Sequence, residues 1–450
     1  MSSEWGTALI DEIKSPTQAS IAIGPFGSRM KSDCYVAQGV KVVRGTNISS
    51  GRTFSGEFVF VTSKKAQELG GANLKPNDLV FPHRGSIGEV GIVPDDGEQY
   101  VISSSLMKLT CDPSRAFPLF IYYFFKSELG RFELLKNSSQ VGTPGIGQPL
   151  ASLKSISVPL PKVDEQKAIA ALLGILDDRI ALLRETNATL EAIAQALFKS
   201  WFVDFDPVRA KAEGLEPEGM DSATAGLFPD SFEESELGLV PRGWATRPIY
   251  DMASYINGAA YKAFEPNADR RGLPIIKIAE LKAGVTSKTA FSDVAMPEKY
   301  LIKTGDILFS WSGNPDTSID TFVWGHDPAL LNQHIFRVLP HASNERSFVL
   351  QTLRNLKPIF AELARNKQTT GLGHVTVADL KRLHVVNPPG SVIEQFNNFA
   401  ETIHQMFFGN EQQAKTLTQL RDTLLPRLIS GELRLPETEA SIENMLSEAV

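Results

Sequence analysis

The sequence predicts an α+β protein in which two mixed α/β domains alternate with two long helices. Residues 161–202 carry apolar side chains at alternating steps of three and four, a heptad pattern that a helix buries against another helix. A second stretch of this kind lies at 391–430. The blocks that precede these stretches match each other in short segments that keep one fixed order. Since 450 residues are too many for one ordinary core, several domains are expected.

The first block, residues 1–160, is predicted to contain many short strands and turns. Strands are expected at 39–48 and 78–81, where apolar runs are bounded by Gly, Pro and Asn. Residues 117–135 begin with Phe-Pro and are rich in apolar side chains, which predicts one packed helix. The loop 136–150 is too long for a simple turn, and loops of this kind often carry function.

The first long helix is expected over 161–203. Asp164 is available as its N-cap, and about 38 residues at about 1.5 Å each give a rod of roughly 57 Å. Asn187 takes the one polar step in an otherwise apolar seam. The seam consists of Ile169, Leu173, Leu176, Ile180, Leu183, Leu190, Ala194, Leu197 and Trp201.

The segment 204–243 is acidic, contains Pro and Gly throughout, and is interpreted as a linker. Four large apolar side chains could instead pin it against a neighbouring domain: Phe205, Leu227, Phe228 and Phe232. A second domain is then expected over 244–390.

This second domain repeats the first. The matching pairs of segments are 39–49 with 272–282, 75–81 with 303–309, 104–109 with 333–338, and 143–166 with 370–395. Collinear matches at an offset of about 230 residues are hard to obtain by chance, so the chain is predicted to be a tandem repeat of a domain followed by a helix.

The second long helix is expected over 391–434, followed by an acidic tail at 435–450. The sequence Ser391 to Glu394 has the spacing of a capping box, and Pro426 predicts a kink or an end in the last turn. The predicted seam consists of Phe396, Phe399, Ile403, Met406, Asn410, Gln413, Leu417, Leu420, Leu424 and Leu428. Its polar steps indicate a specific partner helix, because buried polar residues fix register.

Charge and composition restrict the class of protein. The net charge of −7 argues against a nucleic-acid partner, but it is unevenly distributed. Residues 1–162 and 241–390 have a small excess of Lys and Arg, whereas the remaining segments are acidic, although ordinary surface variation could also produce this. The chain has no apolar run long enough for a membrane span and no signal-peptide pattern, so a cytoplasmic protein without membrane contact is expected. Its two cysteines form no disulfide framework.

Several segments approximate catalytic motifs but lack a required residue. Asn387 to Gly390 resembles the loop of adenine methyltransferases, yet Gly390 stands where an aromatic ring must stack on the base. In the nuclease-like Pro94 to Tyr100, a tyrosine takes the place of the required lysine. The seven histidines show no zinc-ligand spacing. We therefore expect no catalytic residue, no metal site and no cofactor in this chain.

The composition of the loops fits recognition of a polymer better than it fits catalysis. Each block contains polar and basic side chains suited to phosphates and base edges. The candidates in the first block are Arg29, Lys31, Arg44, Thr46, Asn47, His83, Arg84, Ser86, Gln140, Thr143 and Gln148. Those in the second are Lys262, Lys277, Trp311, Ser312, Asn314, Asn332, Gln333, His334, Lys367, Gln368, Thr369 and His374. Any one of these residues could also belong to a solvated loop.

Four segments resemble the specificity subunit of type I restriction-modification systems: ALFKSWFVDFDPVRAKAEG (196–214), LFPDSFEESELGLVPRGW (227–244), GDILFSWSG (305–313) and LRDTLLPRLISGEL (420–433). The similarity covers nearly the whole chain, including the order of its blocks. The resemblance implies two target-recognition domains that alternate with two conserved helices, and these helices pack as an antiparallel coiled coil. It identifies no individual base-contacting residue.

The resemblance also implies the partners. Each domain would read one half of a bipartite site in double-stranded DNA, and the helices would set the spacing and dock two methyltransferase subunits. A restriction and motor subunit could join them. S-adenosylmethionine would belong to the methyltransferase, and ATP and Mg²⁺ to the motor subunit. The alternative is a two-domain protein-binding scaffold without DNA contact.

Overall fold

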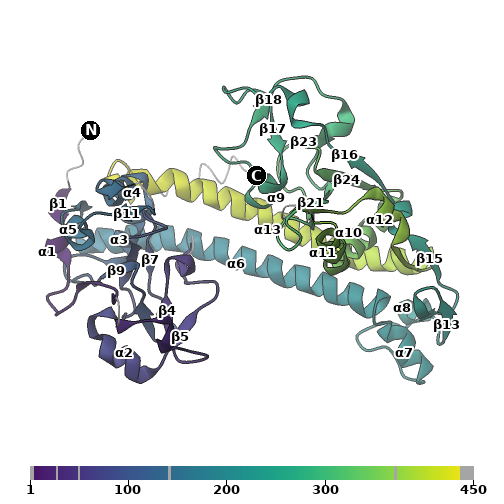
Figure 1. Ribbon diagram of the computed structural model, residues 1–450, viewed down its shortest axis with the longest axis horizontal. Helices are drawn as coiled ribbons and strands as arrows, with labels where there is room; N and C mark the ends of the chain where they lie inside the picture. Colours follow the sequence, from purple (N-terminus) through teal and green to yellow (C-terminus); the bar gives the residue numbers. More distant parts are fainter. Residues whose placement is uncertain (1–4, 27–28, 49–50, 140–142, 369–371, 436–450) are drawn as a thin grey trace. The chain divides into compact units, whose positions relative to one another are not determined.

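The computed structural model describes residues 5–26, 29–48, 51–139, 143–368 and 372–435 (Figure 1). The chain forms two compact units, unit 1 (Met1–Leu183 with Gln413–Val450) and unit 2 (Arg184–Gln412). The long helices α6 (Val163–Phe202) and α13 (Gly390–Ser430) each contribute to both units. Each unit has its own sheets and its own core.

The described residues of unit 1 form two four-stranded sheets and two strand pairs. The first sheet has the order β2-β9-β6-β7 (Ile21–Ile23, Leu106–Leu109, Leu79–Pro82, Gly91–Ile92). The second has the order β3-β5-β4-β8 (Tyr35–Val36, Val59–Val61, Val40–Val43, Tyr100–Ile102). The pairs are β1 with β12 (Gly6–Leu9, Ser157–Leu160) and β10 with β11 (Ser138–Ser139, Gly145–Ile146). Strands β4 and β8 pair in parallel, while the other paired strands described in this unit are antiparallel.

The helices of unit 1, besides the long ones, are α1 (Ile10–Ile13), α2 (Ser63–Leu69), α3 (Pro118–Lys126), α4 (Glu128–Leu135) and α5 (Pro149–Lys154). The single helix predicted for 117–135 is therefore two. Ser127 is extended, and its hydroxyl accepts a hydrogen bond from Gly130 N, so it caps α4. The strand predicted for 39–48 ends at Val43, because a short 3-10 turn follows it.

The core of unit 1 joins its domain to the long helices. Tyr122 and Phe124 of α3 are fully buried, in one cluster with apolar side chains of α6 and α13. Asp177 of α6 accepts a hydrogen bond from Tyr123 Oη at 2.8 Å and forms an ion pair with Arg421 of α13 at 2.8 Å. One carboxylate therefore holds α3 and α13 against α6.

Unit 2 has the same plan. Its first sheet has the order β16-β24-β20-β22 (Ala253–Asn257, Ile335–Pro340, Ile307–Ser310, Asp320–Val323). The second has the order β18-β17-β23-β19 (Phe291–Ser292, Leu273–Ile276, Ala329–Leu331, Leu301–Ile302), with β17 and β23 parallel. The strand pairs are β15 with β26 (Ala245–Pro248, His384–Asn387) and β21 with β25 (Ser312–Gly313, Gly373–His374). The helices of its domain are α9 (Ile278–Ala283), α10 (Arg346–Asn355), α11 (Lys357–Asn366) and α12 (Val377–Arg382).

The acidic segment 204–243 is folded, which corrects its interpretation as a linker. It forms α7 (Asp206–Ala212), α8 (Ser222–Gly226) and the hairpin β13-β14 (Phe232–Ser235, Gly238–Pro241). Phe205 and Phe228 are buried against Trp244 in the core of unit 2. The alternative expectation, that large apolar side chains pin this segment, is the one that the structure bears out, since Leu227 and Phe232 also pack against this core.

The predicted repeat is present down to individual hydrogen bonds. In the turn before β6, Lys75 N donates to Asp78 Oδ2 at 3.0 Å, and the corresponding bond before β20 runs from Lys303 N to Asp306 Oδ2 at 2.7 Å. Each aspartate also pairs with a cation of the neighbouring strand. The pairs are Lys108 with Asp78 at 3.1 Å and Arg337 with Asp306 at 2.8 Å.

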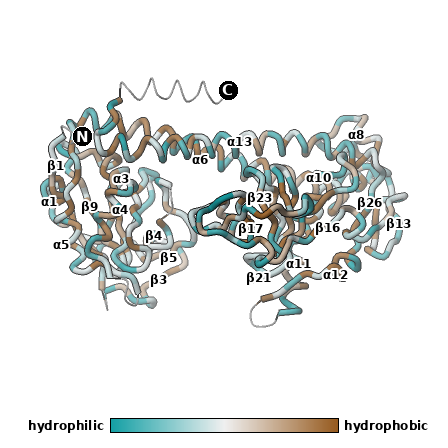
Figure 2. Tube along the Cα trace, turned by 90° about the horizontal axis from the view of Figure 1, so that it is seen from above, coloured by the Kyte–Doolittle hydropathy of each residue, from teal (hydrophilic) through white to brown (hydrophobic). Residues whose placement is uncertain are grey.

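Helices α6 and α13 are antiparallel within each unit, because contacts further along α6 are made to residues further back along α13. Apolar and polar residues follow one another along both helices (Figure 2). In unit 2 the predicted polar steps meet. Asn410 Nδ2 donates to Asn187 Oδ1 at 2.9 Å, and Asn187 Nδ2 donates to Glu411 Oε1 at 2.9 Å and to the Phe407 carbonyl at 3.2 Å. Asn187 is 4% exposed, so these bonds satisfy a buried amide.

The predicted seam is confirmed along α6 from Ile169 to Leu190 and again at Ala194 and Trp201, while Leu197 is half-buried. Along α13 it holds at Phe396, Leu420, Leu424 and Leu428 but is wrong at most positions between Phe396 and Leu420. The exceptions are Phe399 and Met406, which are 44% and 53% exposed, and Gln413, which is exposed; Ile403 and Leu417 are half-buried. The buried positions lie one residue further on, at Ala400, His404 and Ala414. The prediction followed the largest apolar side chains through a strict heptad, whereas a straight helix drifts from that repeat.

Three details at the helix ends also differ from the predictions. Helix α6 begins at Val163, so Asp164 lies in its first turn and is not the N-cap. Helix α13 begins at Gly390, which places Ser391 within the helix instead of at a capping box. Pro426 lies inside α13, which continues to Ser430.

We predict that Leu176→Asp unfolds unit 1, because a buried unpaired charge costs several kcal/mol. The neighbouring Ile175 is 66% exposed, whereas Leu176 is 7% exposed, so Ile175→Asp is the matched control and should change the free energy of unfolding by less than about 0.5 kcal/mol. Urea unfolding followed by circular dichroism measures both. Equal midpoints for the two variants would contradict the observed burial.

Candidate nucleic-acid interface

Each domain has a loop junction at which two predicted candidate segments meet. In unit 1, Ile146 N donates to the His83 carbonyl at 2.9 Å and Gly85 N donates to the Pro144 carbonyl at 2.9 Å. These bonds join the loop after β6 to the loop before α5. In unit 2, Val375 N donates to the Trp311 carbonyl at 2.8 Å, and β21 pairs with β25 beside it. We call these places junction 1 and junction 2.

Junction 1 presents polar side chains to solvent. Arg84, Ser86, Thr143 and Gln148 are exposed, and none of the four forms a side-chain hydrogen bond to another residue that the structure describes. Gln148 has a left-handed backbone, with φ of 45°, at the start of α5. Such a conformation is strained for a residue other than glycine.

A cavity of about 530 Å³ opens beside junction 1. Its wall includes Arg84, Gln148, His83 and Phe26. Phe26 is 48% exposed, and its ring meets the His83 ring edge-on at 6.1 Å. The sequence analysis missed Phe26 because it selected polar side chains, although an exposed aromatic ring can contact a thymine methyl group. The glycines that flank it in the sequence, Gly24 and Gly27, were the available signal.

Three predicted candidates in unit 1 serve the fold instead. Asn47 is fully buried: its amide donates to the Ser55 and Glu57 carbonyls, and its oxygen accepts from Arg44 N. Arg44 donates to the Glu57 carbonyl at 2.8 Å. His83 is 2% exposed with Nε2 at 3.0 Å from the Ser104 carbonyl, and burial lowers its pKa, so the ring is neutral at pH 7. Of the other candidates, Arg29, Lys31 and Thr46 are exposed.

Junction 2 has a different set of side chains. Trp311 is half-buried, and its Nε1 donates to Asn257 Oδ1 at 3.1 Å. Its ring lies 5.6 Å from the ring of His334. Asn257 is a further residue that the sequence analysis missed. Ser312 and His374 face each other across the β21-β25 pair, and both are half-buried.

The exposed Asn314 follows β21 and caps a turn, since its side-chain oxygen accepts hydrogen bonds from Asp316 N and Thr317 N. Gln333 Nε2 lies 3.3 Å from His334 Nε2, and both side chains are half-buried. The Asn314 and Gln333 side chains therefore retain amide donors for a ligand.

Other predicted candidates in unit 2 are held by the fold. Lys367 donates to both carboxylate oxygens of Asp379, at 2.6 and 2.5 Å. Asn332 is 4% exposed. Lys277 lies 4.1 Å above the ring of Tyr261. Lys262 and Gln368 are exposed, while Gln140 and Thr369 lie outside the described residues.

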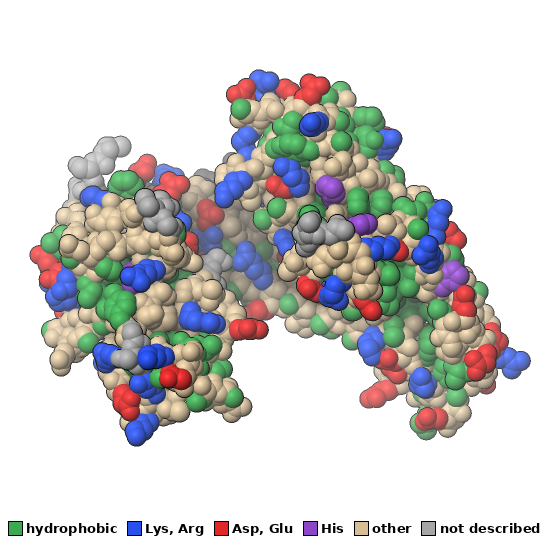
Figure 3. Space-filling view, in the orientation of Figure 1, with side chains coloured by type: hydrophobic (Ala, Val, Ile, Leu, Met, Phe, Trp, Pro, Cys, Tyr) green, Lys and Arg blue, Asp and Glu red, His purple; other side chains and the backbone are tan. Residues whose placement is uncertain are grey.

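Figure 3 shows Lys and Arg side chains interspersed with acidic and apolar ones over the visible face of each unit. The loop junctions, and not a continuous basic patch on this face, therefore define the candidate interface. Among the described residues, no group of three or more His, Cys, Asp or Glu side chains is arranged to hold a metal ion. Within the same ranges, none of the helices has the length and hydrophobicity of a membrane span.

The architecture matches one protein family along most of the chain. The family model described as "Type I restriction modification DNA specificity domain" matches residues 25–192 and 241–424. Together these matches cover more than half of the sequence. The chain belongs to this family. Each match spans most of one domain and most of the long helix after it, in agreement with the predicted repeat.

Specificity subunits of type I restriction enzymes are among the similar proteins. The HindI specificity subunit of Haemophilus influenzae is 25% identical in an alignment over 437 residues, and the alignment covers 86% of this chain and 94% of the relative. The MjaIX specificity subunit of Methanocaldococcus jannaschii is 24% identical over 323 residues, covering 71% and 69%. The crystal structure of the type I restriction-modification S subunit from M. genitalium shares the fold, with a TM-score of 0.56 at 15% identity and coverage of 95% and 96%.

The resemblance predicted from the sequence is thus confirmed. The specificity-domain family favours the main functional prediction over a protein-binding scaffold without DNA contact, because both of its matches are DNA specificity domains.

We predict that Lys367→Gln destabilises unit 2 in a pH-dependent manner. Burial raises the pKa of Asp379, but the hydrogen bonds from Lys367 and Thr376 outweigh it, so the pKa lies below its ordinary value. A lowered carboxyl pKa contributes stability that is present above the unfolded pKa of about 3.9 and is lost as the pH falls through the folded pKa. The variant should therefore unfold about 1–3 kcal/mol more easily at pH 7, and the difference should shrink below about pH 4.

Urea unfolding at several pH values measures this effect. The matched control is Arg365→Gln, because Arg365 pairs with Asp316 on the surface, where both side chains are more than half exposed. That change should have an effect of less than about 1 kcal/mol. A Lys367→Gln effect that does not depend on pH would contradict the role assigned to the Asp379 carboxylate.

Proposed function

We propose that this chain supplies DNA sequence specificity to a type I restriction-modification complex, and that each domain reads one half of a bipartite DNA site. The observation that carries the proposal is the duplicated scaffold with two different junctions. The two domains share the same turns, ion pairs and sheet order. Junction 1 nevertheless offers Arg84 and Gln148, whereas junction 2 offers Asn314 and His374. Two domains that share one scaffold but differ in the side chains of their loops are suited to recognising two different DNA sequences.

The side chains at the junctions have the chemistry for base recognition. Arginine donates two hydrogen bonds to guanine, and a Gln amide makes a matching pair of bonds to adenine in the major groove. The oxygen of Asn314 already accepts from two backbone amides, so this side chain can only donate to an acceptor on a base edge. Arg84, Gln148, Asn314 and Gln333 are the residues to which we assign this role. The exposed Arg29, Lys31 and Lys262 are suited to phosphates, which would position each domain without reading sequence.

We further propose that this chain performs no catalysis itself. Methyl transfer from S-adenosylmethionine would occur in methyltransferase subunits, and ATP with Mg²⁺ would act in a restriction and motor subunit. The role of this chain in the reaction would be to place those partners on their target sequence.

The long helices offer a docking surface for the methyltransferase subunits. Large apolar side chains remain exposed on these helices in each unit: Ile175 at 66% and Leu182 at 52% on α6 in unit 1, and Ile193 at 49% on α6 and Met406 at 53% on α13 in unit 2. Apolar residues repeated along a solvent-facing helix surface indicate a partner helix. The prediction that Met406 belongs to the internal seam is therefore replaced by a role at this outer surface.

We expect Arg84→Ala to weaken binding only when the unit 1 half of the DNA site is intact, and Asn314→Ala only when the unit 2 half is intact. Each loss should be about 1–3 kcal/mol, because one base contact of this kind is removed. Fluorescence anisotropy with each half scrambled in turn provides the measurement. Arg131→Ala, which removes a surface ion pair with Glu89, is the control. Equal weakening on both halves by either variant would overturn separate recognition.

We also expect Leu182→Glu to abolish binding of the methyltransferase subunit without changing the urea midpoint of the isolated chain, since its side chain is half exposed. Leu183→Glu should instead unfold the chain, because Leu183 is 4% exposed. Size-exclusion chromatography of the mixed subunits reports the complex. Normal assembly of the Leu182→Glu variant would argue against docking on this surface.

A further inference from the structure

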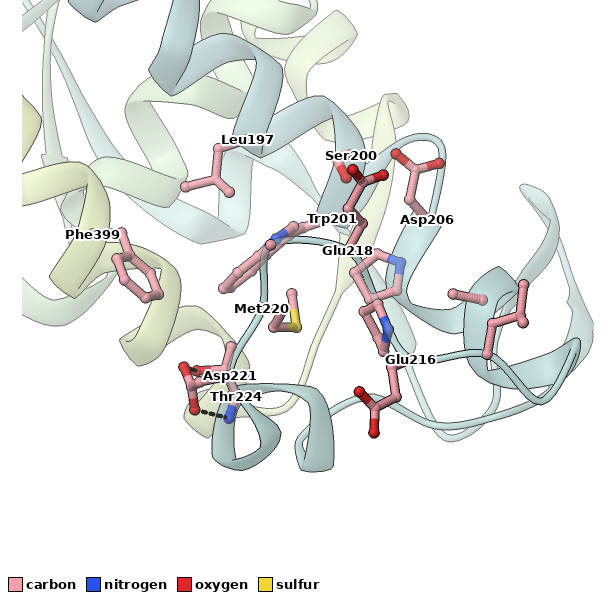
Figure 4. A pocket seen from close by; sticks show the side chains of 15 residues that line it. Leu197, Ser200, Trp201, Asp206, Glu216, Glu218, Met220, Asp221, Thr224 and Phe399 are labelled. Atoms are coloured by element: carbon pink, nitrogen blue, oxygen red, sulfur yellow. Dashed lines mark hydrogen bonds between the residues drawn. The ribbon is translucent and has the colours of Figure 1, made fainter.

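Unit 2 contains a cavity of about 680 Å³ where α6 ends and the acidic segment folds back (Figure 4). Its apolar wall includes Leu197 and Trp201 of α6, Met220 before α8, and Phe399 of α13. Trp201 is 3% exposed and packs edge-on against Phe399, with 6.1 Å between the ring centroids. The cavity therefore has a fixed aromatic floor, while Phe399, at 44% exposed, stands at its opening.

Carboxylates line the other side of this cavity. Asp206, Glu216 and Glu218 are exposed, and none of them forms an ion pair with another residue that the structure describes. In Figure 4 Asp206 and Glu216 lie on the side opposite to Phe399 and Leu197. The segment 204–236 carries ten acidic residues and two basic ones, so its charge is not neutralised locally.

The cavity is preformed by polar contacts. Asp221 caps α8 by accepting hydrogen bonds from Ala223 N and Thr224 N, each at 3.0 Å. Gln395 of α13 donates to Thr224 Oγ1 at 3.0 Å, which fixes α8 against the long helix. A ligand therefore meets a preformed apolar wall with exposed carboxylates beside it, and a preformed wall lowers the entropic cost of binding.

The charge of the rim excludes several occupants. DNA phosphates would be repelled by the carboxylates. The tail 436–450 carries four Glu and no Lys or Arg, so it has the wrong sign as well. A second copy of this chain, with a net charge of −7, offers little complementarity. The occupant that fits this cavity therefore carries an apolar side chain, which packs against the wall, and cations, which pair with the carboxylates of the rim.

We propose that this cavity receives an amphipathic segment of the methyltransferase subunit, in which an aromatic or long aliphatic side chain is flanked by Lys or Arg. The inference rests on the proposed function and adds a second contact to it, which does not involve Ile175, Leu182, Ile193 or Met406. The apolar side chain packs against Trp201 and Met220. The flanking cations pair with Glu216 and Glu218 at the rim.

The test uses the full chain and the methyltransferase subunit, with the Kd measured by isothermal titration calorimetry. The double variant Glu216→Lys/Glu218→Lys should bind at least about tenfold more weakly, because two attractions become repulsions. Phe399→Ala should also weaken binding, without a change in the urea midpoint. The control Glu213→Lys/Glu234→Lys alters the same acidic segment outside the cavity and should bind as the wild type does. Added salt should weaken wild-type binding and strengthen binding of the first double variant.

A photo-crosslinking amino acid at position 399 identifies the occupant directly. A crosslink to a Lys- or Arg-containing peptide of the methyltransferase subunit supports the proposal. A charge exchange supports it as well: when those cations of the methyltransferase subunit are changed to Glu, binding to the Glu216→Lys/Glu218→Lys variant should be restored. Crosslinks to DNA, to the C-terminal tail or to a second copy overturn it. Unchanged binding of the cavity variants, while Leu182→Glu loses the complex, overturns this inference and leaves the proposed function intact. If the wild-type chain binds no methyltransferase subunit, the proposed docking fails as well, and the half-site experiment then decides the DNA-recognition part.

Discussion

The structure depends on two long helices that must each bury one face against the other and a second face against a domain. In unit 1 Asp177 of α6 makes both kinds of contact, because it accepts a hydrogen bond from Tyr123 of the domain and pairs with Arg421 of α13. In unit 2 the corresponding polar contact is between Asn187 and Asn410. A buried amide pair of this kind tolerates only one register, since any slip of the helices leaves its donors unsatisfied. The apolar seam supplies stability, and these polar contacts select one alignment.

The same scaffold is built twice, with internal bonds that do not involve the loops. The aspartates that end the turns before β6 and β20 each hold a backbone amide and a cation of the adjacent strand. Because these bonds are made within the turns and strands themselves, side chains at junctions 1 and 2 can differ without disturbing the fold. This separation of scaffold from loops is what a protein needs to recognise two unrelated half-sites.

Polar residues in the loops serve two purposes that the sequence does not distinguish. Asn47 and Lys367 have the composition of DNA contacts, yet one closes a turn and the other neutralises Asp379. Arg84 and Gln148 have the same composition and remain exposed. Residue type predicts which groups can bind a base, but each buried donor and acceptor must first be satisfied within the protein. Only the three-dimensional arrangement shows which side chains that requirement consumes.

The sequence by itself determined the class of fold, the tandem repeat, the two helices and the family, because heptad periodicity and collinear matches are properties of residue order. It also identified Asn187 and Asn410 as polar steps. Tertiary structure decided the face that α13 buries, where Ala400 is buried in place of Phe399 and Ala414 in place of Gln413. It also decided that the acidic segment 204–243 folds against α6 and forms a cavity. Both outcomes depend on packing between residues far apart in the chain, for which local composition and periodicity contain no information.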